Sequence, residues 1–263
     1  MPIDEKNRIS ILGMKVDMVE IPNVIEAMEG WINKKLFHNY IVVSNADGVM
    51  KHKVDIRMRQ AVNASSLSVP DGFSLICLGR LKGYSLKRRV YGPDLMSEFI
   101  DTTKDKEYSH FFYGGNGVTL DKLLSNLKHK FPDLKIAGYY SPPFRALTPE
   151  EDRLVIERIN SSNPDVLWVG IGCPKQEIWM LEHKDKLNVP VMVGVGAAFD
   201  FLAGTKPQAP TWIRNNGFEW LFRFASEPKR LWRRYLINNS LFVFYVTLEL
   251  ISKAFTLNKN KSN

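Results

Sequence analysis

The regular alternation of short apolar segments with longer amphipathic ones constrains the fold of this chain most. Short runs rich in β-branched and aromatic residues recur, among them "NYIVVSN", "SLSV", "YSHFFYGG", "LKIAGYY", "DVLWVGIG" and "VPVMVGVG". Most precede a segment with helical periodicity, and the clearest such segments span 49–61, 94–103, 118–130, 149–160 and 175–187. Strands and helices alternating at this spacing predict an α/β fold with a mainly parallel, Rossmann-like sheet flanked by helices.

The size and composition of the chain fit this fold. Its 263 residues suffice for one large domain or for one domain with an appendage. Hydrophobic residues make up 44% and charged residues 24%, which is typical of a globular protein with a buried core. Only Cys77 and Cys173 could form a disulfide, and the start "MPIDEKNRIS" lacks the pattern of a secretory signal. We therefore expect a cytoplasmic protein.

Five loops that directly follow predicted strands are candidate pocket loops. They lie at Asn45, at Asp71, at Gly114-Gly115, and in the segments "GCPKQE" and "GVGAAFD". Ligands of open α/β sheets bind beyond the carboxyl ends of the strands, where such loops converge. The sequence therefore predicts one binding site assembled from these loops.

The stretch "LSVPDGFSLI" places a single carboxylate, Asp71, in an otherwise apolar run. Pro-Asp-Gly between apolar segments predicts a tight turn. Its position after a strand allows a second interpretation, in which Asp71 is a catalytic carboxylate at the strand tip. The pattern alone leaves both interpretations open.

Two glycine-rich segments, "FYGGNGVTL" and "VMVGVGAAFD", each have the order strand, glycines, helix. Such turns let backbone amides approach a phosphate or a sugar, although a plain tight turn is the commoner meaning. Neither matches the full G-x-G-x-x-G dinucleotide pattern, so an oxidoreductase has little support. Lys175 and Gln176 begin a helix, where they can face a ligand, and Glu177 could equally interact with the helix dipole.

Metal ligands are not evident in the sequence. It has no D-x-D pair, no H-x-x-x-H and no paired cysteines, and its five histidines are scattered. Cys173 has no histidine nearby in sequence that would make it a nucleophile, so a packing role is favoured. We predict no metal and no cofactor.

The net charge of +8 is concentrated in two clusters. Seven basic and two acidic residues lie between Lys206 and Arg234, and "RLKGYSLKRR" holds five basic residues without an acid. Such fields attract phosphates of nucleic acids, of lipids or of diphosphate substrates, although a solvated basic face is a simpler explanation of any one run. Charge alone does not identify the phosphate.

The last segment differs from the rest, and we divide the chain into an α/β domain, 1–205, and a basic, aromatic, helical appendage, 206–263. Its apolar run "LFVFYVTLELI" contains Glu249 and is shorter than the roughly 18 apolar residues expected of a membrane span. Aromatic residues interleaved with arginine fit a helix lying on an anionic membrane, or else a helix packed on the core. The same aromatics could serve a contact in a homo-oligomer.

Six segments together resemble one known family. They follow in order at 45–47 ("NAD"), 70–72 ("PDG"), 89–95 ("RVYGPDL"), 172–177 ("GCPKQE"), 194–204 ("GVGAAFDFLAG") and 218–230 ("FEWLFRFASEPKR"). This series resembles the WecG/TagA/CpsF family of bacterial glycosyltransferases, and the resemblance runs from about Ile9 to about Asn239.

The resemblance implies an inverting, metal-independent transfer of a sugar from a UDP-sugar to an undecaprenyl-diphosphate-linked saccharide. The reaction would take place at the cytoplasmic membrane face and serve cell-surface polysaccharide synthesis, of capsule, exopolysaccharide or teichoic acid type. No nucleic acid partner is implied.

The residue roles that the resemblance implies follow the matched motifs. Asp71 corresponds to the proposed general base, Asn45 to an asparagine beside the acceptor pocket and Gln176 to a donor-site residue. Further candidate substrate-binding residues are Lys175, Gly114, Gly115, Gly194, Gly196 and Arg89, with Arg214, Arg223 and Arg230 as candidate ligands of a diphosphate.

Two positions depart from the family pattern. Val43 stands where many members have threonine, and Gln208 stands where many have arginine. Both argue against simply transferring the best-known donors of the family, UDP-N-acetylmannosamine or its uronic acid, to this chain. "YYSPPFR" resembles the capsule and exopolysaccharide branches. A nucleotide-dependent oxidoreductase or epimerase, and a non-catalytic basic module for membrane or nucleic acid, remain alternatives.

Overall fold

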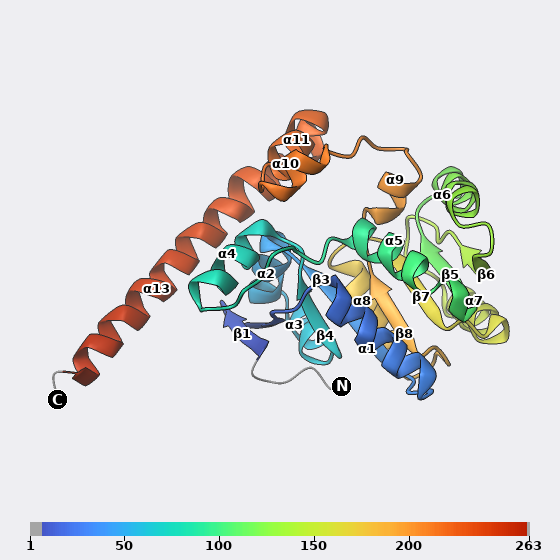
Figure 1. The fold of residues 1–263 in the computed structure, drawn as a ribbon, viewed down its shortest axis with the longest axis horizontal. Coiled ribbons are helices and arrows are strands. Elements are labelled where there is room, and N and C mark those ends of the chain that lie inside the picture. Colours follow the sequence, from blue (N-terminus) through green and yellow to red (C-terminus); the bar gives the residue numbers. More distant parts are fainter. Residues whose placement is uncertain (1–6, 262–263) are drawn as a thin grey trace.

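A six-stranded parallel sheet forms the centre of the computed structural model, which describes residues 7–261 (Figure 1). Its strands are β3 (Asn39–Ser44), β4 (Leu67–Pro70), β5 (Ser109–Gly114), β6 (Lys135–Tyr140), β7 (Val166–Gly170) and β8 (Val191–Gly194). Their spatial order is β4-β3-β8-β7-β5-β6, and every neighbouring pair is parallel. The predicted α/β class is confirmed.

Helices cover both faces of the sheet, which agrees with the mainly apolar residues of its inner strands. Neighbouring strand residues alternate between two cores: Ile41 packs on one face, and Tyr40 and Val42 pack on the other. The first face carries α1 (Ile21–Asn33), α5 (Gly92–Thr102), α6 (Gly117–Lys130) and α9 (Ala198–Leu202). The second carries α2 (Ala46–Val54), α3 (Ile56–Asn63), α4 (Phe73–Leu81), α7 (Pro149–Ser162) and α8 (Lys175–His183). A short 3₁₀ helix, η2 (Lys104–Lys106), follows α5.

One predicted helix is in fact two. The segment predicted as a single helix over 49–61 is broken at Asp55 into α2 and α3. The side chain of Asp55 accepts hydrogen bonds from the backbone N–H groups of Arg57 (2.8 Å) and Met58 (3.3 Å). A carboxylate in this position caps a new helix, so it restarts the helix where periodicity alone predicts continuity.

The first part of the chain contains elements that our sequence analysis did not predict. Strands β1 (Arg8–Ile11) and β2 (Met14–Asp17) form an antiparallel hairpin, and α1 follows them. The apolar residues of α1 recur at helical spacing, as in Ile21, Val24, Ile25 and Met28, so its signal was present. The hairpin strands have four residues each and offer too short a pattern to identify.

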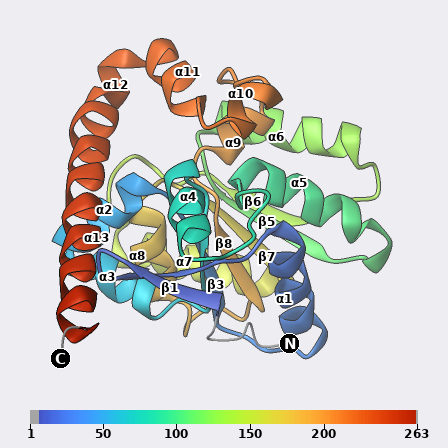
Figure 2. The same ribbon diagram turned by 60° about the vertical axis from the view of Figure 1, so that its left-hand side comes forward.

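After α9 the chain continues into the C-terminal helices, our name for α10 to α13. These are α10 (Thr211–Asn215), α11 (Glu219–Ser226), α12 (Pro228–Trp232), the π-helix η3 (Arg233–Asn238) and α13 (Asn239–Lys261). Figures 1 and 2 show that α12, η3 and α13 form one long rod beside the α/β layers. This rod packs against α2, where Phe242 is buried, and Glu249 accepts a hydrogen bond from the Leu12 backbone N–H at 3.1 Å.

The rod corrects our expectation about membrane spans. The helix over Pro228–Ser252 has 25 residues and a window of mean hydropathy 1.3, and only 11% of that window is buried. By length and composition alone it could cross a membrane. Counting only the uninterrupted apolar run underestimated the length of this apolar helix, because a helix can contain isolated polar residues such as Glu249 and still be apolar on average.

Candidate functional site

Two cavities meet at the carboxyl edge of the sheet, where four of the five predicted pocket loops converge. The Gln176 cavity, of about 390 Å³, lies over the ends of β3, β7 and β8 and includes Val43, Gln176, Gly194 and Gly196. The Tyr235 cavity, of about 570 Å³, lies between α4, α11 and the rod and includes Ser74, Trp220, Tyr235 and Phe242. The two cavities share Asn45, Asp47, Asp71, Arg223 and Arg234. Both volumes lie in the range of small-molecule sites.

Asp71 lies in the connection from β4 to α4, which differs from the predicted tight turn. The backbone N–H groups of Asp71 and Gly72 both donate to the carbonyl oxygen of Ser44, at 2.7 and 3.2 Å, and Gly72 is extended (φ −75°, ψ 133°). A Cβ atom at Gly72 would lie 3.2 Å from Cα of Asn45. The segment therefore continues the strand and passes directly into a helix, with glycine allowing its close approach to Asn45.

The carboxyl group of Asp71 is polar, largely buried and only partly paired. Its side chain is 19% exposed, and Oδ1 has no hydrogen-bond partner in the described part of the chain. Burial raises the pKa of Asp71 to about 6, although Arg89 opposes the rise, and the nearby charge of Glu219 adds to it. Such a carboxylate is a stronger base than an exposed one and is still ionised at neutral pH.

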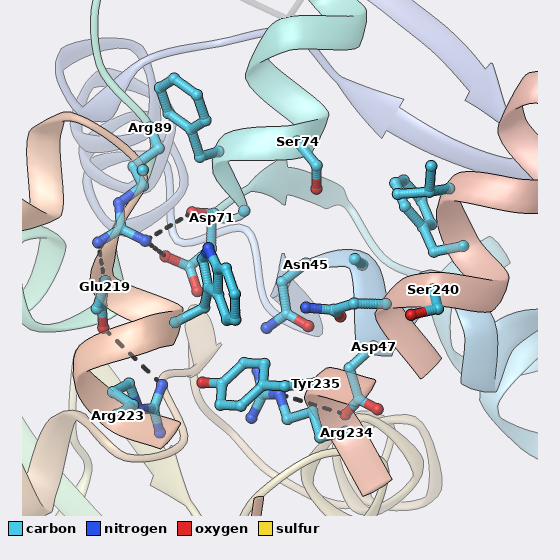
Figure 3. Close-up of a pocket in the computed structure, with 18 residues that line it drawn as sticks. Asn45, Asp47, Asp71, Ser74, Arg89, Glu219, Arg223, Arg234, Tyr235 and Ser240 are labelled. Atoms are coloured by element: carbon cyan, nitrogen blue, oxygen red, sulfur yellow. Dashed lines mark hydrogen bonds and ion pairs between the residues drawn. The ribbon is translucent and has the colours of Figure 1, made fainter. Parts of the chain in front are cut away.

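Arg89 connects Asp71 to the C-terminal helices (Figure 3). Its Nη1 lies 3.6 Å from Asp71 Oδ1 and donates to the backbone oxygen of Asp71 at 3.2 Å. Nη2 donates to the buried carboxylate of Glu219 on α11, which in turn lies 3.9 Å from Nη1 of Arg223. The guanidinium also lies over the ring of Tyr91. We predicted Arg89 as a substrate-binding residue, and its contacts fit it to orient Asp71.

Asn45 caps the helix that follows β3. Its Oδ1 accepts a hydrogen bond from the Gly48 backbone N–H at 3.2 Å. The side-chain Nδ2 has no hydrogen-bond partner within the described residues, and Asn45 lines both cavities. An amide donor is thus available at the boundary of the two cavities, beside Asp71.

Gln176 links two of the pocket loops. It is 3% exposed, and its Oε1 accepts hydrogen bonds from the N–H groups of Gly172 (3.2 Å) and Gly196 (3.1 Å), while Nε2 donates to Glu177. A Cβ atom at Gly194 would lie 2.9 Å from Cε of Met180 and 3.0 Å from Nε2 of Gln176, so a larger residue there would displace both side chains. Gln176, Gly194 and Gly196 therefore shape the floor of the Gln176 cavity.

The structure does not bring three other predicted sites into the lining of either cavity. Gly114 and Gly115 pack β5 against β7, since a Cβ atom at Gly114 would lie 2.5 Å from the backbone of Gly170. Lys175 is exposed at the start of α8. Arg214 forms an ion pair with Asp94 at 2.9 Å and lies over Tyr91.

Four arginines of the C-terminal helices line the Gln176 cavity: Arg223, Arg230, Arg233 and Arg234. Arg223 and Arg230 were predicted. Arg233 and Arg234 were not, although their position on one helical face with Arg230 was a usable signal. Also missed were Asp47 and Glu219, which stand within the motifs "NAD" and "FEWLFRFASEPKR".

Alternative chemistry finds little support at the site. Burial raises the pKa of the Cys173 thiol well above its usual value, which agrees with a packing role rather than a nucleophilic one. Glu177, considered as a dipole partner, is buried, and burial raises its pKa. No group of three or more His, Cys, Asp or Glu side chains suited to a metal ion occurs among the described residues. The absence of a metal from the reaction stays a prediction.

Comparisons with known proteins agree with the sequence motifs. The model of the "Glycosyl transferase WecG/TagA/CpsF family" matches residues 9–255. A protein of Bacillus spizizenii is 28% identical over 197 residues, which cover 75% of this chain and 74% of the relative. One of Staphylococcus aureus (strain MW2) is 26% identical over 237 residues, which cover 89% and 91%. Both are named N-acetylglucosaminyldiphosphoundecaprenol N-acetyl-beta-D-mannosaminyltransferase.

Proposed function

Because the chain belongs to the WecG/TagA/CpsF family and is a glycosyltransferase, we propose that it transfers a sugar from a UDP-sugar to an undecaprenyl-diphosphate-linked saccharide. The names of both relatives give such a lipid-linked sugar as the acceptor. An enzyme with this acceptor works at the membrane, and cell-surface polysaccharide synthesis is the process it would serve. The family assignment leaves the oxidoreductase, epimerase and non-catalytic alternatives without support.

The position of Asp71 in the wall between two cavities carries this proposal. A transferase that moves a sugar in one step must bring the acceptor hydroxyl, with the base beside it, to the face of the anomeric carbon opposite the leaving group. We assign the donor to the Gln176 cavity, whose floor is built from glycine turns, and the acceptor to the Tyr235 cavity, which opens between α4 and the rod. Asp71, which lines both cavities, then stands where the two substrates meet.

The reaction follows from a single base and two substrates. Ionised Asp71 takes the proton of an acceptor hydroxyl while that oxygen forms a bond to the anomeric carbon of the donor. The bond from this carbon to the UDP oxygen breaks, and UDP leaves with the electron pair. A single displacement of this kind inverts the anomeric centre. Asn45 donates a hydrogen bond from Nδ2 to a substrate beside Asp71.

The leaving diphosphate needs stabilisation, and the C-terminal helices supply it. Arg223 and Arg230 line the Gln176 cavity, where guanidinium groups can bind phosphate oxygens in bidentate geometry. Arg223 has a 15% exposed side chain and so acts in a site of lowered polarity, whereas Arg230 is bound by Glu227 through two hydrogen bonds of 2.6 Å. These arginines supply the charge that a metal ion supplies in other transferases.

A membrane partner fits the exposed surface of the C-terminal helices. Large apolar side chains gather there at unusual density: Trp212, Phe218, Trp220, Leu221, Trp232, Leu236, Ile237, Leu241, Val243, Phe244, Leu248, Leu250 and Ile251. Tryptophan and aliphatic residues beside arginines suit the boundary between lipid headgroups and acyl chains. We propose that this surface lies on the cytoplasmic face of the membrane and presents the Tyr235 cavity to the lipid-linked acceptor.

The donor sugar remains between two proposals. The relatives' names favour N-acetylmannosamine, and the departures at Val43 and Gln208 favour another sugar. Val43 lines the Gln176 cavity, and Nε2 of Gln208 donates to the hydroxyl of Tyr91, another lining residue, at 3.4 Å. Both positions therefore act on the cavity assigned to the donor.

Thermal-shift measurements with a panel of UDP-sugars, followed by transfer to a short-chain lipid-linked acceptor, test the proposal. One UDP-sugar should stabilise the protein, and Asp71→Asn should keep this stabilisation while transfer falls by about 10²–10⁴. Asp121→Asn, the same change on exposed α6, is the matched control and should transfer normally. A fully active Asp71→Asn variant would exclude Asp71 as the base.

A further inference from the structure

Asp47 is a buried carboxylate that joins the sheet edge to the C-terminal helices. Its side chain is 6% exposed and accepts a hydrogen bond from Asn238 Nδ2 at 2.7 Å. Lys51 Nζ lies 2.8 Å and Arg234 Nε lies 3.8 Å from Oδ2. Although burial opposes its ionisation, Arg234 and Lys51 hold the pKa of Asp47 below the ordinary value. The group is therefore a fixed negative charge at neutral pH.

Two of the partners of Asp47 come from an irregular turn in the rod, whereas Lys51 belongs to α2. Arg234 and Asn238 both belong to η3, where the backbone N–H of Asn239 donates to the carbonyl oxygen of Arg234. Residues four apart lie on the same side of a helix, so one carboxylate can bind both side chains. Single π-helical turns inside α-helices often occur at functional sites, because they change which side chains face a neighbour.

The contact between Asp47 and Arg234 leaves most of the guanidinium free. Asp47 lies nearest Nε, and the two terminal nitrogens form no hydrogen bond or ion pair with another described residue. Arg234 lines both cavities and contributes to the charge around Asp71 (Figure 3). A guanidinium held at Nε can still offer its outer edge to a phosphate oxygen.

We propose that Asp47 is a positioning residue, which holds Arg234 at the boundary of the two cavities so that Arg234 binds a substrate diphosphate there. This inference rests on the proposed function and adds two residues to it. The Asp47 carboxylate then has two effects: it holds the rod against α2, and it orients the guanidinium of Arg234. Arg233, the neighbouring basic residue, lines only the Gln176 cavity and has no contact with Asp47.

Inorganic pyrophosphate is the probe for the test, with binding to the full-length protein measured by calorimetry. Asp47→Asn and Arg234→Gln should each weaken pyrophosphate binding about tenfold, and the double variant should bind no more weakly than the single ones, because both act through one guanidinium. Asp55→Asn is the matched control. It removes the same charge at the cap of α3, where asparagine caps equally well, and should leave binding unchanged.

A second variant covers the case in which Asp47→Asn does not fold. Asn238→Ala removes one contact of Asp47 and keeps its charge, and it should weaken binding about threefold in the wild-type background but have no effect beside Arg234→Gln. Additive losses, an Arg234→Gln variant that binds normally, or wild-type protein that does not bind pyrophosphate would each overturn the inference. Failure of every UDP-sugar to serve as donor would instead contradict the proposed function, because the pyrophosphate comparison does not depend on transfer.

Discussion

The two parts of the site are attached to the protein in different ways. Asp71 and Asn45 stand at strand ends, and Gln176 stands in the first turn of α8. All three are fixed through backbone groups: Asp71 by the carbonyl of Ser44, and Gln176 by two loop N–H groups. The C-terminal helices are attached in large part through side-chain charges, in the pairs Arg89–Glu219, Arg214–Asp94 and Arg234–Asp47, beside a few apolar contacts. The carboxylate that we propose as the base is therefore held rigidly, whereas the arginines that we propose to bind the diphosphate depend on docking.

The balance of contacts supports this difference. The rod and its neighbours bury few large side chains, chiefly Leu231, Tyr235 and Phe242. Each such side chain contributes about 1.5–3 kcal/mol. Removing the arginine that pairs with a buried carboxylate, as in Arg89–Glu219 and Arg234–Asp47, costs up to about 3–5 kcal/mol. The ion pairs thus matter as much as the apolar contacts. Removing one charged side chain should therefore weaken the docking of the C-terminal helices, whereas it should not affect the core of the sheet.

The largest effect should come from removing the C-terminal helices beyond α10. A chain ending at Asn216 keeps Asp71, Asn45 and Gln176 but loses every arginine that lines the Gln176 cavity. Since one electrostatic donor contributes about 10²–10³ to a rate, transfer should fall by at least about 10³. The measurement is transfer to a short-chain acceptor in detergent, with circular dichroism to confirm that the sheet remains folded.

A chain ending at Ser252 is the matched control, because it keeps all residues that line either cavity and should stay active. Undiminished transfer by the shorter chain would mean that the strand-end loops alone form a complete site.

The sequence predicted the strand-end half of the site better than the helical half. Asp71, Asn45 and Gln176 each follow an apolar strand, and the parallel topology brings such positions together without knowledge of any side-chain contact. Gly114 and Gly115 also follow a strand, but they lie where β5 packs on β7. The prediction failed there because the sequence pattern is the same for a glycine that makes room for a ligand and for one that makes room for a neighbouring strand.

The helical half depends on contacts between residues far apart in the chain. Glu219 and Arg89 are 130 residues apart, and Asp47 and Asn238 are 191 apart. Neither pair has a local pattern that could identify it. The π-helical turn at 233–238 is equally invisible in the sequence, since its periodicity differs little from that of an α-helix. A basic run predicts phosphate binding in general, and only the fold decides which arginines face the site.

A smaller effect is expected where the two parts meet, at Glu219. Because Asp71 must be ionised to act as a base and its pKa is raised to about 6, kcat/KM should fall about tenfold per pH unit below pH 6 and level off above it. The charge of Glu219 contributes to this rise, so Glu219→Gln should move the acid limb to lower pH by about half a unit to one unit.

The measurement is kcat/KM against pH at constant ionic strength. Glu227→Gln is the control on the same helices, because Glu227 binds Arg230 and has no part in the charge around Asp71, and its acid limb should not move. If the acid limb of the Glu219→Gln variant stays in place or moves to higher pH, the docked C-terminal helices do not raise the pKa of Asp71.

The smallest expected effect compares one exposed aromatic side chain from each part of the molecule. Trp212 on α10 is 67% exposed, and Phe144, between β6 and α7, is 93% exposed. If only the C-terminal helices lie on the membrane, Trp212→Ser should weaken binding to vesicles with anionic phospholipid by about three- to tenfold, which corresponds to roughly 1 kcal/mol of lost apolar contact. Phe144→Ser should bind as the wild type does, although it removes the more exposed ring. If both variants lose vesicle binding equally in a sedimentation assay, the membrane contact extends to the α/β layers. The ion pairs that attach the C-terminal helices would then not be the only connection between the membrane and Asp71.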